Sequence, residues 1–195
     1  MPAMKMSYQK QLVVELANVS FGNKGDCLMA LAVQKNLPLV VENVAFATRA
    51  RVSAQTLRRH GLMRLAQLPI GYQRDPRAGI KTIVNRVAAS KLAQPVVERA
   101  FGMVPFGRVD VLLDVCGFSY SDHWGEARMR RDRDLFLKAK RDGKQIVLLP
   151  RTYGPFEGER MRALARETIG LADLVFVRDK RSYNFLLELG FAADE

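Results

Sequence analysis

Short, unbroken apolar runs alternate with stretches of helical periodicity along this chain, and that alternation limits the fold more than any other feature. The apolar runs, which read as strands, are residues 11–17, 39–47, 109–115, 145–149 and 174–177. The helical stretches are residues 26–37, 53–62, 81–101, 126–141, 158–170 and 181–189. Strands that are apolar throughout are typical of parallel sheets covered by helices on both faces. The sequence therefore predicts an α/β fold with a mainly parallel sheet, and its 195 residues fit one domain over 1–195.

A few residues set the expected ends of these elements. Ser53 is expected to cap the helix that it precedes, while Pro38 and Pro150 are expected to end the helix and the strand before them. Residues 69–79 contain two Pro and two Gly, and residues 117–125 separate a strand from a helix. Both segments are expected to be loops.

Composition excludes several classes of protein. The two cysteines, Cys27 and Cys116, rule out a disulfide-rich scaffold, and two histidines supply too few ligands for a structural zinc site. The basic N-terminus lacks the apolar stretch of a secretory signal, and no apolar run approaches the length of a membrane span. We therefore expect a cytoplasmic protein without a bound metal.

The net charge of +11 is concentrated in one part of the chain. Residues 49–99 carry eleven Lys/Arg and two Asp/Glu, whereas residues 106–195 carry sixteen and fifteen. This excess favours anionic partners, such as phosphorylated substrates, anionic lipid or nucleic acid. Nucleic acid is the least favoured of these, because few aromatic residues lie among the basic ones and no nucleic-acid motif is present.

The loops that follow the predicted strands hold the candidate site, because open α/β sheets bind ligands at the carboxyl ends of their strands. The first loop, residues 22–26, reads Gly-Asn-Lys-Gly-Asp and opens a helix. Glycine lets the backbone approach a ligand closely, and the free N–H groups of a helix N-terminus suit an anion or a polar sugar. The alternative is a plain capping turn in which Asp26 stabilises the helix dipole.

The second loop, within residues 114–125, holds the single Trp, a Tyr, a His and two Asp. His123 beside Asp122 could act as a general acid or base. The alternative is a surface histidine with no chemical role. Cys116, at the end of the strand, is read as a small core residue.

The third and fourth loops carry arginines directly after apolar strands. Arg151 could hold a carboxylate or phosphate through two hydrogen bonds, or it could pair with a neighbouring acid. Arg178 and Lys180 could form an anion pocket around Asp179. The alternative is that Asp179 caps the next helix while the basic side chains are solvated.

Together the four loops resemble the polysaccharide pyruvyl transferase family. The family has Gly-Asn-x-Gly-Asp after a strand, an Asp and apolar residues leading into a Gly-containing loop, Pro-x-Ser/Thr-x-Gly-Pro-Phe, and apolar-Arg-Asp-x-x-Ser. This chain shows the same order at residues 22–26, 110–117, 150–156 and 177–182. It differs in having Cys116 where the family often has Gly, and Arg151 where the family often has Gln.

The resemblance implies a Rossmann-like three-layer domain, equivalent to the N-terminal half of a two-domain GT-B-type fold, so a second domain is expected to be absent. It implies transfer of a pyruvyl group from phosphoenolpyruvate to two hydroxyls of a sugar, as a ketal. The acceptor would be a cell-surface glycan or its lipid-linked precursor, and no cofactor is required. The substrate-binding residues implied are Asn23, Gly25, Asp26, Arg151, Tyr153, Arg178 and Lys180. The candidates for proton transfer are Asp122 and His123.

Two further expectations concern partners. The chain could instead be a non-catalytic sugar- or nucleotide-binding module that needs a separate partner half, or it could form a homo-oligomer. The basic residues 49–99 carry none of the four motifs, so we expect them to form a separate surface facing an anionic membrane at the cytoplasmic leaflet.

Overall fold

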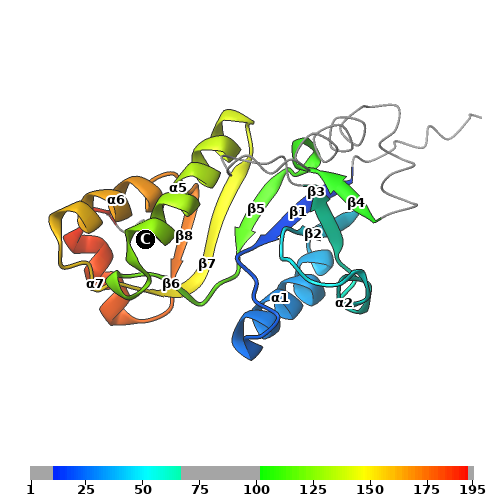
Figure 1. Ribbon diagram of the computed structural model, residues 1–195, viewed down its shortest axis with the longest axis horizontal. Helices are drawn as coiled ribbons and strands as arrows, with labels where there is room; N and C mark the ends of the chain where they lie inside the picture. Colours follow the sequence, from blue (N-terminus) through cyan, green and yellow to red (C-terminus); the bar gives the residue numbers. More distant parts are fainter. Residues whose placement is uncertain (1–10, 67–101, 193–195) are drawn as a thin grey trace, which may run out of the picture.

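The computed structural model describes residues 11–66 and 102–192. Within these residues eight strands form one sheet, in the order β4-β3-β2-β1-β5-β7-β6, and β8 also pairs with β7 (Figure 1). The strands are β1 (Leu12–Ala17), β2 (Val44–Thr48), β3 (Met63–Ala66), β4 (Met103–Pro105), β5 (Val111–Asp114), β6 (Phe118–Tyr120), β7 (Gln145–Tyr153) and β8 (Leu174–Val177). All their pairings are parallel, as the apolar strands predict.

Helices connect these strands. The α-helices are α1 (Lys24–Asn36), α2 (Ala54–Arg59), α5 (Gly125–Arg141), α6 (Glu159–Ile169) and α7 (Lys180–Glu188). The short 3-10 turns are η1 (Leu37–Leu39), η2 (Phe106–Arg108) and η3 (Asp122–Trp124). The predicted cap of α2 is confirmed, because the Ser53 side chain accepts a hydrogen bond from the backbone N–H of Thr56.

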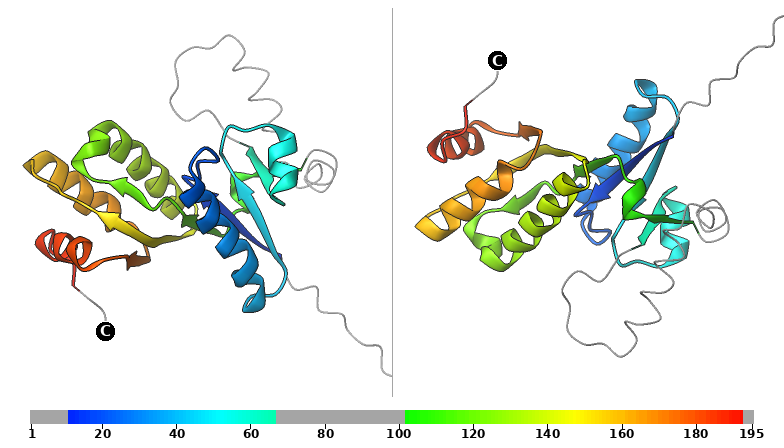
Figure 2. Two further views of the ribbon diagram at one scale, coloured as in Figure 1. Left: turned by 90° about the horizontal axis from the view of Figure 1, so that it is seen from below. Right: turned by 90° about the horizontal axis from the view of Figure 1, so that it is seen from above.

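The two faces of the sheet bury separate apolar clusters, because side chains alternate along each strand. Val13 and Leu112 belong to the cluster that α5 and α6 complete, whereas Val14 and Leu113 belong to the cluster that includes residues of α1 and α2. Figure 2 shows α1 and α5 on opposite sides of the central strands. The three-layer, Rossmann-like arrangement of the prediction is therefore confirmed.

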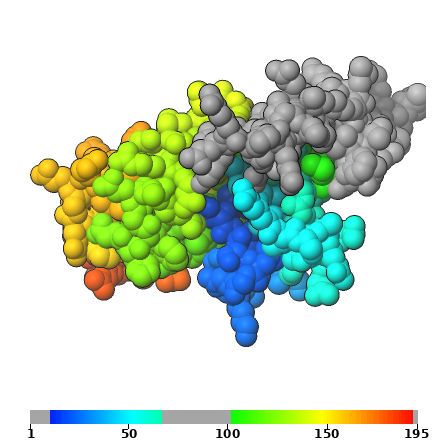
Figure 3. All heavy atoms as spheres, viewed as in Figure 1, coloured from blue at the N-terminus to red at the C-terminus, as the bar shows by residue number. Residues whose placement is uncertain are grey.

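Helices α5 and α6 also bind each other through side chains on their exposed surfaces. An ion pair joins Arg133 of α5 to Glu167 of α6 at 3.3 Å. In the space-filling view, the yellow-green and orange surfaces of these two helices are continuous (Figure 3). Helices α5 and α6 together form the outer layer on this face of the sheet.

Two predicted element ends are wrong. Leu39 lies in the turn η1 and the strand begins only at Val44, because Pro38 favours a tight turn rather than an extended chain. Pro150 does not end its strand, since β7 continues to Tyr153. The register between β7 and β8 shifts between Leu148 and Arg151, and such an irregularity tolerates a residue that lacks an N–H group.

The sequence analysis did not predict three short strands. β3, β4 and β6 have four, three and three residues, which is too short for an apolar run to be recognised. β6 lies inside residues 117–125, which were expected to be a loop throughout. The predicted loop at 69–79 and helix at 81–101 lie outside the described residues.

Gly154, directly after β7, makes a prediction about stability. Its φ is +72°, and a Cβ built on it would lie 2.5 Å from Cδ2 of Phe185 in α7. Gly154→Ala is therefore expected to lower the free energy of unfolding by more than about 2 kcal/mol, measured by urea denaturation. Gly143→Ala is the matched control, because Gly143 has φ +69° but open space around its Cβ position, and should cost only about 1 kcal/mol. Equal losses in the two variants would contradict a steric role for Phe185.

Candidate functional site

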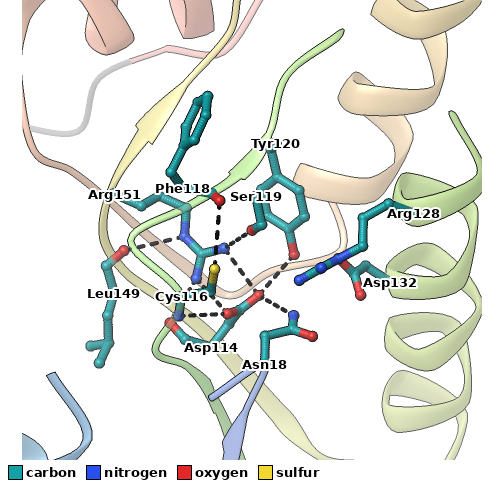
Figure 4. A network of polar contacts seen from close by, with 10 residues as sticks. All are labelled: Asn18, Asp114, Cys116, Phe118, Ser119, Tyr120, Arg128, Asp132, Leu149 and Arg151. Atoms are coloured by element: carbon teal, nitrogen blue, oxygen red, sulfur yellow. Dashed lines mark hydrogen bonds and ion pairs between the residues drawn. The ribbon is translucent and has the colours of Figure 1, made fainter. Parts of the chain in front are cut away.

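A buried ion pair lies at the carboxyl ends of the adjacent strands β5 and β7. Nη2 of Arg151 lies 2.8 Å from Oδ1 of Asp114, and both side chains are fully buried (Figure 4). Arg151 also donates from Nη1 to Oδ2 of Asp114 at 3.0 Å and from Nη2 to the Asp114 backbone carbonyl at 2.6 Å. The structure thus gives Arg151 the neighbouring acid that the sequence left open as the alternative to a ligand anion. Arg151 also lies in a strand, so its placement in a loop was wrong.

Other buried groups complete the bonding of this pair. Tyr120 Oη and Asn18 Nδ2 each donate to Oδ2 of Asp114 at 2.9 Å, and Arg151 donates to Oγ of Ser119 at 3.0 Å (Figure 4). Burial alone would raise the pKa of Asp114, but the charge and hydrogen bonds of Arg151, together with Asn18, hold it below its ordinary value. Asp114 is therefore ionised.

A second carboxyl group, Asp132 on α5, lies beside the pair. Burial raises its pKa to about 6, and the charge of Asp114 adds to this rise against the opposing charges of Arg128 and Arg151. Arg128 Nε lies 3.6 Å from Oδ2 of Asp132. That oxygen is buried and has no hydrogen-bond partner among the described residues. Asp132 thus carries a proton far more readily than an exposed carboxyl would.

A third carboxyl group, Asp26, lies in the first turn of α1 and is only 5% exposed. Burial raises its pKa, and so does Asp114, while the backbone of Gly117 and of Ser20 and the charge of Arg128 favour the ionised form. Asp26 therefore faces the second loop and the buried pair, which is more than the dipole role weighed in the sequence analysis.

Asn23 and Gly25 form the cap of the same helix. The Asn23 side chain accepts a hydrogen bond from the backbone N–H of Gly25 at 2.9 Å. A Cβ at Gly25 would lie 3.2 Å from Oδ1 of Asn23, which is tighter than most real contacts. The capping turn, weighed above as the alternative to a ligand loop, is thus present, and it orients Asp26.

Arg178, in the fourth loop, also lies close to Gly117. A Cβ added at Gly117 would lie 3.7 Å from Nη1 of Arg178, and Nη2 donates to Oγ1 of Thr152. The Arg178 side chain remains 58% exposed, and the Arg178 backbone N–H bonds to the carbonyl of Arg151. Gly117 therefore has Asp26 and Arg178 as neighbours, so the first, second and fourth loops meet around it.

In the rest of the fourth loop, Asp179 and Ser182 make hydrogen bonds within the protein. Asp179 caps α7 by accepting a hydrogen bond from the Ser182 N–H at 2.8 Å, as the capping alternative predicts. Ser182 Oγ accepts the N–H of Tyr153 at 2.9 Å, which fastens α7 to β7. Lys180 is exposed at the start of α7.

The two candidates for proton transfer differ in their surroundings. Asp122 accepts a hydrogen bond from the Glu157 N–H at 2.8 Å, and its own N–H bonds to the carbonyl of Pro155. It therefore fastens the third loop to η3. His123 is exposed and packs against Phe118 and Trp124.

Tyr153, the remaining predicted substrate-binding residue, is fully buried. Its hydroxyl has no hydrogen-bond partner among the described residues, and burial raises its pKa well above the ordinary value. Contact with a substrate would require its surroundings to open.

Sequence reasoning gave no role to six polar residues of this site: Asn18, Asp114, Ser119, Tyr120, Arg128 and Asp132. Asn18 has a positive φ of 56°, and Arg128 and Asp132 are one turn apart on α5. The four-residue spacing on a predicted helix was a readable signal of an ion pair, but not of its burial. Among the described residues no group of three or more His, Cys, Asp or Glu is placed to hold a metal. No helix in the same part of the chain is long and apolar enough to cross a membrane.

The burial of the Asp114–Arg151 pair leads to a prediction about the free energy of unfolding. Arg151→Met leaves a buried carboxylate without its cation and should cost about 3–5 kcal/mol of unfolding free energy. Adding Asp114→Asn to that variant should cost less than the sum of the two single changes, since the unpaired charge is gone. Urea denaturation of the four proteins measures this coupling, and strictly additive losses would contradict it.

Asp132 makes a prediction about pH. The pKa of Asp132 is about 6 in the folded protein, above its ordinary value of 3.8. As pH falls, the folded protein therefore binds a proton at Asp132 before the unfolded chain does, and the free energy of unfolding rises between about pH 7 and pH 4. Asp132→Asn should remove this slope and raise stability at neutral pH by up to about 3 kcal/mol. Denaturant titrations at several pH values measure both effects.

The control for that experiment is Asp134→Asn, since Asp134 is an exposed carboxylate on the same helix. It should change stability by no more than about 0.5 kcal/mol at any pH. A loss of stability in Asp132→Asn at neutral pH would mean that the carboxylate is held by a favourable interaction with Arg128.

Comparison with known proteins identifies the family of this chain. A family model described as polysaccharide pyruvyl transferase matches residues 23–193, which include the Asn23 cap, Asp114, Gly117, Arg151 and Arg178. No curated protein and no solved structure matches the chain. The family match covers most of the 195 residues, including the ends of β5, β7 and β8, but not the end of β1 with Asn18. This chain therefore belongs to the polysaccharide pyruvyl transferase family.

Proposed function

We propose that this domain takes part in transfer of a pyruvyl group from phosphoenolpyruvate to two hydroxyls of a sugar. The observation that carries the proposal is the meeting of Asp26 and Arg178 around Gly117, which brings a carboxyl group and an exposed cation to one edge of the sheet. The reaction needs these two kinds of group, because the donor is an anion and the acceptor must lose protons.

Arg178 is the group we assign to the donor. Its guanidinium is exposed, so it can bind the carboxylate or phosphate of phosphoenolpyruvate, and Thr152 fixes its position. Lys180, two residues further along the chain, is also exposed and adds positive charge. We assign Arg151 a supporting role for the loop carrying Gly117, because its side chain is buried and pairs with Asp114.

Asp26 is the group we assign to the acceptor. Its raised pKa makes the carboxylate a better base than an exposed aspartate, which suits removal of a proton from a sugar hydroxyl. Over the whole reaction, the two hydroxyls lose two protons. One proton goes to the donor methylene carbon and two C–O bonds form at the adjacent carbon. The bond between that carbon and the phosphate oxygen breaks, and the second proton leaves with the phosphate. His123, exposed beside this edge, is the candidate acid for the methylene carbon.

The domain would act with a second α/β unit that faces this edge, as in the two-domain arrangement implied by the resemblance. The second unit would supply the far side of the acceptor site. The alternative function is a sugar- or nucleotide-binding module without catalysis, and release of phosphate from phosphoenolpyruvate in the presence of glycans separates the two. The acceptor as a cell-surface glycan or its lipid-linked precursor is part of the same proposal.

A membrane-facing role for residues 49–99 stays a prediction. Residues 67–101 lie outside the described part, and of the described basic residues Arg49 pairs with the buried Glu15 and Arg64 donates to the carbonyl of Val52. Binding to anionic vesicles that weakens as salt rises would support a lipid-phosphate contact.

The donor assignment predicts the effect of one substitution. Arg178→Ala should weaken phosphoenolpyruvate binding by about tenfold or more, measured by calorimetry, because a charge-assisted contact is lost. Arg141→Ala is the control, since Arg141 is exposed at the far end of α5 and should leave affinity unchanged. Equal affinity in the wild-type and Arg178→Ala proteins would exclude Arg178 from the donor site.

A further inference from the structure

Three aromatic side chains form an exposed surface beside the candidate site: Phe118, His123 and Trp124, called here the aromatic platform. The centroid of the Phe118 ring lies 6.2 Å from that of His123 and 6.1 Å from that of Trp124. The centroids of the His123 and Trp124 rings are 5.3 Å apart. Phe118 is 37% exposed and Trp124 is 44% exposed. Apolar rings gathered at a surface mark a place where something binds.

The platform is held in place from below. Arg128 lies with its guanidinium carbon 5.7 Å from the centre of the Trp124 ring, and its Nε is 3.6 Å from Asp132. A cation over one side of an aromatic ring restrains the ring. The side chain of Trp124 is thus linked through Arg128 to the buried carboxyl group of Asp132.

The platform also lies next to the groups assigned to the reaction. Phe118 directly follows Gly117, and Gly117 lies close to Arg178 and to Asp26. Arg128 acts on the charge of Asp26 as well as on Trp124. The same edge of the sheet therefore combines exposed aromatic rings, one of them the imidazole of His123, with a carboxylate and cations.

That combination fits a sugar ring. A pyranose has one face of C–H groups that packs on an aromatic ring, and hydroxyls at its rim that need hydrogen-bonding partners. A donor as small and as highly charged as phosphoenolpyruvate has no comparable apolar face. We propose that the aromatic platform binds a sugar ring of the acceptor, with Asp26 and His123 near its hydroxyls. This inference rests on the proposed function, in which the acceptor is a glycan.

Trp124 provides the measurement, because it is the only tryptophan of the chain. The full chain is titrated with methyl hexosides and disaccharides to their solubility limits, and acrylamide quenching of tryptophan fluorescence is followed. A bound sugar ring should shield the indole, so quenching should fall along a saturable curve. No saturable change with any of these saccharides would overturn the proposal.

Two variants locate the effect. Phe118→Ala removes one ring of the platform and should weaken the apparent affinity by about tenfold. Phe176→Ala is the matched control, because Phe176 is 46% exposed on β8 and lies in no ring contact with Trp124 among the described pairs. Equal weakening in both variants would mean that the platform is not the sugar site.

A third titration, with uridine monophosphate, separates a sugar from a nucleobase. Protection of Trp124 by the nucleotide but by no saccharide would replace the sugar with a base and contradict the proposal. The result is independent of the donor test. Sugar binding without phosphoenolpyruvate binding would leave the platform in place and remove the transferase proposal, and the opposite result would remove only the platform.

Discussion

The buried pair of Asp114 and Arg151 is the interaction on which the site depends. Each side chain is fully buried, and an isolated charge in such a place would cost several kcal/mol, so each stabilises the folded state only in the presence of the other. The pair ties β5 to β7 where both strands end, and it sets the position of the loop that begins at Cys116, whose N–H bonds to Asp114. The loop that carries Gly117 is therefore held by this pair, while the Asn23 cap and Thr152 position Asp26 and Arg178 beside it.

The site combines rigid support with exposed chemistry. Beneath the surface, Asn18, Tyr120 and Ser119 satisfy the pair, and above it Arg178 and the platform rings face outward. Two carboxyl groups, Asp26 and Asp132, have raised pKa values because burial and the negative charge of Asp114 disfavour their ionised forms. A group that must move protons near neutral pH gains from such surroundings.

The sequence predicted the fold class and the main strands, because apolar runs such as β8 are read directly from residue order, and it predicted the cap at Ser53. It could not predict that Pro150 lies inside a strand, since that depends on the pairings of both neighbours. The same limit applies to Arg151, because an arginine after a strand is compatible with solvent or with a buried acid. Arg128 and Asp132 were read as part of a helix, and only packing shows which helix face is buried.

The pairing of β1 with β5 has a consequence for the order in which the chain can fold during synthesis. The backbone N–H of Val13 bonds to Asp110, which is 97 residues further along, and the ion pair at the end of β5 must wait for Arg151. Contacts so distant in sequence close slowly, because a long segment must first lose its freedom. As the ribosome releases the chain, β1, β2 and β3 are therefore made before β5, the central strand with which β1 pairs, and they must wait for it with one edge of β1 unpaired.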